Sequence, residues 1–171
     1  MALYHFSVRH VSRGKGQMVV ASAAYIFGQR IFDSYYNKIH DYTSKSGVVF
    51  TEILTPEYVP ERLTDRETLW NEVEHVERNN KAQLAYSFDI ALQNELTLEE
   101  NIRMAKEFCQ EQFVARGMIV DLAVHEGKSD NEEEPDNPHF HVLVPLRPFT
   151  EEGIWGNKQR REYILDEDGT G

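Results

Sequence analysis

Short stretches in which apolar and polar residues alternate, or in which apolar residues run together, predict most of the strands of this chain. Alternation is clearest at Leu3–Val11, where Phe6 and Val8 are interleaved with polar side chains. The same patterns predict further strands at Val48–Leu54, Ala82–Leu92, Ile119–His125 and Pro138–Val144.

Three segments have the composition or apolar spacing of helices. Residues 18–32 are mostly alanine and aliphatic, whereas residues 64–79 and 97–116 each carry one apolar stripe. The last two begin with a capping-box pattern, threonine followed three residues later by glutamate (Thr64 with Glu67, Thr97 with Glu100). Helices interleaved with these strands predict an α+β domain with a single antiparallel sheet and flanking helices.

The connecting segments differ in character. Residues 34–50 are polar and tyrosine-rich, so we expect mostly irregular structure before the strand at Val48–Leu54. Residues 126–138 contain six carboxylates and predict an acidic, mobile loop. Because the pattern weakens after Arg147, we expect residues 1–171 to form one domain at the N-terminal end of a longer protein.

Composition narrows the class of protein. The 171 residues, 40% hydrophobic and 27% charged, suit one globular domain with a real core. Cys109 is the single cysteine, which excludes an internal disulfide framework and a cysteine-based zinc cluster and fits a reducing cytoplasm. No apolar run is long enough to cross a membrane.

Charge is distributed unevenly. The net charge of −11 argues against general attraction to nucleic acid. Residues 1–47, however, carry six basic and two acidic side chains, a net +4, which leaves −15 on the remainder. A basic N-terminal region of this kind can bind a polyanion locally.

Three histidines lie at the ends of two predicted strands. Because side chains alternate along a strand, His139 and His141 share one face, and a returning antiparallel strand can place His125 beside them. Three imidazoles leave open positions on a bound metal, which suits chemistry on a substrate oxygen. A solvated strand face is the alternative that this pattern leaves open.

A phosphodiester reaction at such a metal also needs a nucleophile. Tyr25 is the candidate, because the preceding alanines in Ala23-Ala24-Tyr25 leave room for a bulky ligand. An aromatic side chain on an apolar helix is commonly a core residue, so the pattern allows both interpretations.

Four segments follow one another along the chain: Ala2-Leu3-Tyr4-His5-Phe6, Gly16-Gln17, Ala23-Ala24-Tyr25 and Asn137-Pro138-His139-Phe140-His141. In this order they resemble the MobA/MobL relaxases, which are HUH-type nicking enzymes of mobilisable plasmids and integrative elements. The resemblance implies a five-stranded antiparallel sheet with flanking helices, a three-histidine metal site and one catalytic tyrosine near the N-terminus.

By position, the resemblance gives Tyr25 the nucleophile role and makes His125, His139 and His141 the metal ligands. Asp89 occupies the place of a family acid and is expected to orient a metal-binding imidazole. The implied cofactor is Mn²⁺ or Mg²⁺, and three imidazoles also make Zn²⁺ possible. The chain departs from the family pattern at Met18, Ile26, Ser87 and Gln93.

The expected function is metal-dependent nicking and transesterification of one DNA strand at an origin of transfer, through a 5′-phosphotyrosine intermediate. The expected partners are single-stranded or hairpin DNA, together with other relaxosome and conjugation coupling proteins, and no membrane. The candidate DNA contacts are Arg9, Arg13, Lys15, Gln17 and Arg30, with Tyr35 and Tyr36 as candidates for base stacking.

Two other classes stay open. A three-histidine zinc hydrolase would activate water without covalent use of a tyrosine. A non-catalytic DNA-binding mobilisation accessory protein would carry these histidines incidentally.

Overall fold

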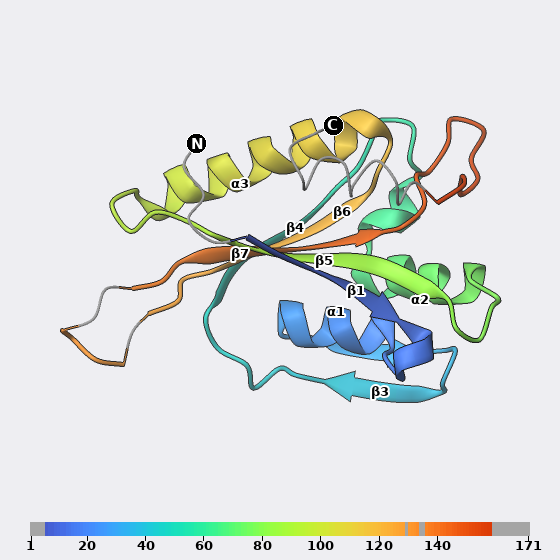
Figure 1. Ribbon diagram of the computed structural model, residues 1–171, viewed down its shortest axis with the longest axis horizontal. Coiled ribbons are helices and arrows are strands. Elements are labelled where there is room, and N and C mark those ends of the chain that lie inside the picture. Colours follow the sequence, from blue (N-terminus) through green and yellow to red (C-terminus); the bar gives the residue numbers. More distant parts are fainter. Residues whose placement is uncertain (1–5, 129, 134–135, 159–171) are drawn as a thin grey trace.

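A five-stranded antiparallel sheet lies at the centre of the computed structural model, which describes residues 6–128, 130–133 and 136–158 (Figure 1). In spatial order its strands are β1 (Phe6–Ser12), β5 (Gln83–Ala91), β7 (His139–Pro145), β6 (Val120–His125) and β4 (Val48–Leu54). This sheet confirms the expected fold class and the predicted strands, apart from residues 3–5, which lie outside the described residues.

Alternation along the central strands gives each face of the sheet its own hydrophobic core. Helix α3 (Leu98–Gln112) covers the face that carries Phe88 and Phe140. Helices α1 (Val19–Phe27) and α2 (Arg66–Val76) cover the opposite face (Figure 1). The core on that side includes several alanines of α1 and of the sheet. Helices therefore flank both faces, and no described helix has the length and apolar character needed to cross a membrane.

Helix α1 is shorter than predicted because Gly28 ends it. Gly28 adopts φ = 64°, a left-handed C-cap conformation that reverses the chain. The hairpin of β2 (Arg30–Asp33) and β3 (Lys38–Asp41) follows. The predicted continuation of the helix to residue 32 is therefore wrong, and so is the predicted irregular structure at β3. A buried hydrogen bond of 2.9 Å between His40 Nε2 and Asp33 Oδ2 holds the hairpin together.

The two capping predictions have different outcomes. Thr97 and Glu100 form the expected reciprocal capping box at the start of α3. At α2 the N-cap is Asp65, whose carboxylate accepts a hydrogen bond from the Thr68 backbone N–H, so the predicted Thr64 and Glu67 box is wrong. Thr64 belongs instead to a 3-10 turn, Glu61–Thr64, where its hydroxyl donates to the Glu61 carbonyl.

Buried charges connect α2 to the rest of the domain. The Arg13 guanidinium, in the 3-10 turn Arg13–Lys15 after β1, pairs with Glu74 on α2 at 2.6 Å. Farther along, the fully buried Asp121 of β6 accepts hydrogen bonds from Arg66 and from Trp70 Nε1. Such groups are tolerated in the interior because their hydrogen bonds replace those that water would make.

Candidate active site

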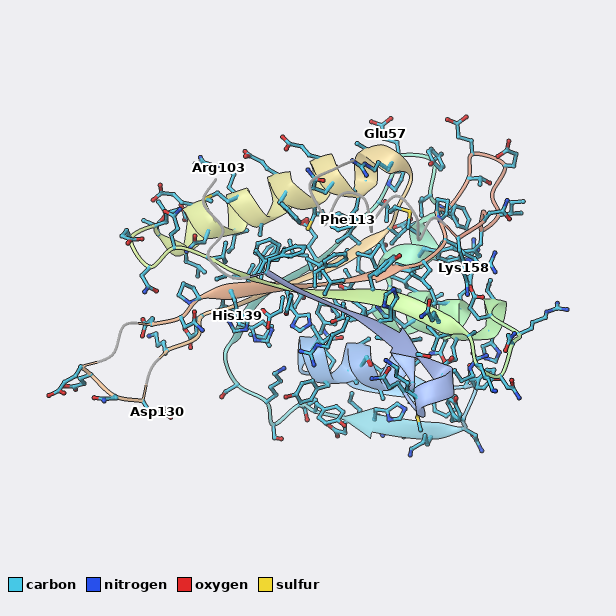
Figure 2. All side chains as sticks on the ribbon, viewed as in Figure 1. Glu57, Arg103, Phe113, Asp130, His139 and Lys158 are labelled. Carbon is cyan, nitrogen blue, oxygen red and sulfur yellow. The ribbon has the colours of Figure 1, made fainter. Side chains whose placement is uncertain are left out.

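Strand pairing brings the three histidines together. His125 pairs with His139 across β6 and β7, and His141 pairs with Ala123 two residues farther along. The rings of His125 and His139 stack at a centroid distance of 4.8 Å, and those of His125 and His141 are 6.3 Å apart. Figure 2 shows His139 at the end of the sheet where the chain enters the loop after β6.

The environment of this histidine cluster (His125, His139 and His141) keeps two of its rings neutral. Burial lowers the pKa of His125 and of His141 to about 4. The positive charge of Lys45 acts in the same direction, whereas the Asp89 carboxylate opposes it. At neutral pH both imidazoles are therefore in the form that binds metal ions.

The three imidazoles of the histidine cluster are suitable ligands for a divalent cation, but their rings do not converge on one point. Among the described residues, no three histidine, cysteine or carboxylate side chains surround a common point as placed. His125 Nε2 is nevertheless buried with no hydrogen-bond partner in the described part of the chain. An orphaned imidazole nitrogen beside two further imidazoles fits a set of residues that would hold a divalent metal ion.

Tyr25 projects from α1 and is not a core residue. Its side chain is 56% exposed, unlike that of its neighbour Ala24, which is fully buried. Tyr25 and His141 line the same groove, which has a volume of about 170 Å³ and runs between α1 and strands β1, β5 and β7. The groove is open to both the phenol and His141, and because Tyr25 is exposed, the alternative of Tyr25 as a core aromatic is wrong.

The family follows from comparison with known proteins. The sequence pattern of the MobA/MobL family matches residues 17–171. This chain belongs to the MobA/MobL family.

Curated relatives of this MobA/MobL protein are conjugal transfer and mobilisation proteins. It is 36% identical to the conjugal transfer protein TraA of Agrobacterium fabrum (strain C58 / ATCC 33970), over 99% of this chain and 15% of that protein. It is 31% identical to the mobilisation protein MobL of Acidithiobacillus ferridurans, over 91% of this chain and 41% of that protein. The chain thus spans less than half the length of these relatives.

A solved structure shares the fold of this MobA/MobL protein. It comes from work on the molecular basis of vancomycin resistance transfer in Staphylococcus aureus. The two chains superpose with a TM-score of 0.81 and 37% sequence identity, over 94% of this chain and 78% of that one.

Two polar residues of β5 lie beside His141 in this MobA/MobL protein. The Ser87 hydroxyl is hydrogen-bonded to His141 Nε2 at 2.9 Å. Asp89 pairs directly with His141 across β5 and β7, so both side chains lie on the α1 face of the sheet. Ser87 was missed as a site residue, although its position two residues before Asp89 on a strand places both on one face.

The predicted DNA-binding residues fall into three groups. Arg9 and Gln17 line the groove with Tyr25. Lys15 and Arg30 are exposed but do not line it, and Arg30 lies 3.9 Å from Asp41 on the hairpin. The remaining residue, Arg13, is buried against α2, and this corrects its assignment as a DNA contact.

The two tyrosines predicted to stack on bases lie at the turn of the β2–β3 hairpin. Tyr35 is 40% exposed, and its ring contacts that of Tyr36 at a centroid distance of 4.9 Å. The Arg13 guanidinium lies 4.5 Å from the centre of the Tyr35 ring. The turn thus has an aromatic surface outside the groove.

Proposed function

We propose that this MobA/MobL chain is a relaxase domain that nicks one DNA strand at an origin of transfer and becomes linked to its 5′ end. The observation that carries the proposal is the groove shared by the exposed Tyr25 and His141. In this groove the Tyr25 phenol, as nucleophile, and His141, as a candidate metal ligand, can both reach one bound phosphate group. The names of the conjugal transfer and mobilisation relatives support the same process.

The proposed reaction is a transesterification. The Tyr25 phenolic oxygen forms a bond to the phosphorus of the scissile phosphodiester, and the bond from phosphorus to the 3′ oxygen breaks. The phenol proton is released and the leaving 3′ oxygen ends as a hydroxyl. Because the 5′-phosphotyrosine link conserves the phosphoester, attack by a 3′-hydroxyl reseals the strand and regenerates Tyr25.

His125, His139 and His141 would hold a divalent cation, Mn²⁺ or Mg²⁺, with Zn²⁺ as the third possibility. When bound, it supplies Lewis-acid stabilisation of negative charge on the phosphate oxygens. Ser87 and Asp89 orient His141 from the neighbouring strand. Arg9, at the other wall of the groove, provides a cation for the DNA backbone.

The proposed substrate is single-stranded or hairpin DNA from an origin of transfer in a plasmid or integrative element. Relaxosome and conjugation coupling proteins are the proposed protein partners, and the cytoplasm is the proposed compartment.

Incubation with end-labelled single-stranded DNA and Mn²⁺, followed by a denaturing gel, tests this function. The protein should give a covalent protein–DNA band that Tyr25→Phe abolishes, while Tyr58→Phe, a change at another exposed tyrosine, retains it. Cleavage by Tyr25→Phe without an adduct would support the zinc hydrolase instead. DNA binding without cleavage by any variant would support the accessory protein.

A further inference from the structure

Lys45 lies directly on the Tyr25 side chain. Its Nζ is 4.0 Å from the centre of the Tyr25 ring and donates a hydrogen bond of 2.8 Å to the Tyr25 backbone carbonyl. Lys45 comes from the segment between β3 and β4, twenty residues after Tyr25. Neither the strand pattern nor the histidine motif singles out this lysine.

Two other contacts fix this arrangement. The ring of Tyr42 meets the Tyr25 ring edge-on, at a centroid distance of 5.3 Å and an interplanar angle of 90°. The Lys45 backbone N–H donates to the Tyr42 carbonyl, which closes a turn between these two residues. An exposed tyrosine is thereby held by a cation over its ring face and by a second ring perpendicular to it.

The segment that carries Lys45 also leads to the histidine cluster. Three residues after Lys45, Val48 pairs with His125 across β4 and β6. Lys45 therefore contacts the Tyr25 ring from a segment that is itself held beside His125. A lysine has three N–H donors, and the hydrogen bond to the Tyr25 carbonyl occupies one of them.

We propose that Lys45 is a phosphate-binding residue of this site, which holds the Tyr25 ring and donates to the phosphate that Tyr25 attacks. This assignment rests on the proposed nicking function. A lysine ammonium is a compact point charge suited to phosphate oxygens, and a donor already fixed in place stabilises charge that develops during the reaction. The same ammonium would neutralise the phosphotyrosine diester after strand cleavage.

Three variants distinguish phosphate binding by Lys45 from a purely structural role in holding the Tyr25 ring. Lys45→Met keeps the length of the side chain and removes the charge, whereas Lys45→Arg keeps both charge and donors. Lys38→Met is the matched control, because Lys38 is an exposed lysine on the nearby hairpin and takes no part in the contacts that Lys45 makes with Tyr25. Circular dichroism and thermal unfolding establish that each variant is folded.

The first readout is the rate of covalent adduct formation at saturating single-stranded DNA. We expect Lys45→Met to slow it by about 100-fold, as the loss of one fixed donor does at other sites. Lys45→Arg should stay within about tenfold of the unsubstituted protein, and Lys38→Met within about twofold.

The second readout needs no chemistry. In a Tyr25→Phe background, Lys45→Met should reduce the slope of log K against log salt concentration for single-stranded DNA by about 0.7, the value for one lost phosphate contact. An unchanged slope together with an adduct rate within threefold of the unsubstituted protein would overturn the proposal. The proposal would also be overturned if Lys45→Met left the slope unchanged and Lys45→Arg formed the adduct as slowly as Lys45→Met. That result would assign Lys45 a purely structural role in holding Tyr25.

The two proposals can fail separately. If the slope falls but the unsubstituted protein forms no adduct, Lys45 contacts phosphate and the nicking function is refuted. If the unsubstituted protein forms the adduct and Lys45→Met matches its rate and slope, the nicking function stands and the role of Lys45 is refuted.

Discussion

His125 and His139 face each other across β6 and β7, with rings stacked at 4.8 Å and 16° from parallel. The loop between them closes at its base, where the Asn137 N–H donates to the Gly127 carbonyl at 2.8 Å. Gly127 has φ = 56°, and a Cβ there would lie only 1.9 Å from the Asn137 carbonyl oxygen. A glycine at this close approach allows both histidines to reach the same end of the sheet.

Loss of any cluster histidine should weaken metal binding. We expect His125→Ala, His139→Ala and His141→Ala each to reduce Mn²⁺ affinity by at least about tenfold in calorimetric titration, because each removes one imidazole ligand. His75→Ala, a change at an exposed histidine of α2, should leave the affinity unchanged. Equal affinities for all four variants would contradict the three-histidine site.

Ser87→Ala should weaken the site without unfolding the domain. The change removes the hydrogen bond to His141 Nε2, so the ring loses an orienting partner. We expect Mn²⁺ affinity to fall by about tenfold, whereas Ser22→Ala, a change on α1 in the same groove, should leave Mn²⁺ affinity unchanged. An increase in affinity would show instead that Ser87 competes with the metal for His141.

Metal-free protein should lose stability as pH falls from about 6.5 to about 4. The unfolded chain protonates its histidines near pH 6.5, whereas His125 and His141 have pKa values of about 4 in the folded state. Protons therefore bind preferentially to the unfolded chain in this window, at a cost on the order of 3 kcal/mol for each histidine.

Urea denaturation in the presence of a chelator measures this effect. The double variant His125→Gln/His141→Gln should have a flatter dependence of unfolding free energy on pH between 4 and 6.5. Identical pH profiles for the variant and the unsubstituted protein would refute the assigned protonation states.

Breaking the buried Arg13–Glu74 pair should destabilise the domain strongly. Arg13→Met leaves the Glu74 carboxylate without the cation that lies 2.6 Å away, in a fully buried position. We expect a loss of about 3–5 kcal/mol in unfolding free energy by urea denaturation. Arg62→Ala, which breaks the exposed pair with Glu72, should cost less than about 1 kcal/mol.

Strand alternation and family resemblance were sufficient to predict the sheet and the convergence of His125, His139 and His141. The strands and the shared face of His139 and His141 follow from local periodicity, which the sequence displays directly. The β2–β3 hairpin was missed because a single glycine, Gly28, ends α1 against an otherwise helical pattern. The left-handed conformation of Gly28 belongs to the folded backbone and is not displayed by the apolar pattern.

The contacts around the site residues depend on tertiary packing and could not be inferred in the same way. The sequence predicts Arg13 as a phosphate contact because its charge can be read directly. Its pairing with Glu74, 61 residues away, cannot be read from the sequence. Lys45 and Ser87 acquire their significance only from the side chains that the fold places beside them.

The most direct test of the central claim is to locate the covalent link itself. After reaction with a short single-stranded oligonucleotide and Mn²⁺, the adduct is digested with protease and nuclease and its peptides are sequenced by mass spectrometry. The account predicts a nucleotide attached through phosphate to the Tyr25 side chain. Attachment at another residue, or strand cleavage with no attached nucleotide on any peptide, would contradict it.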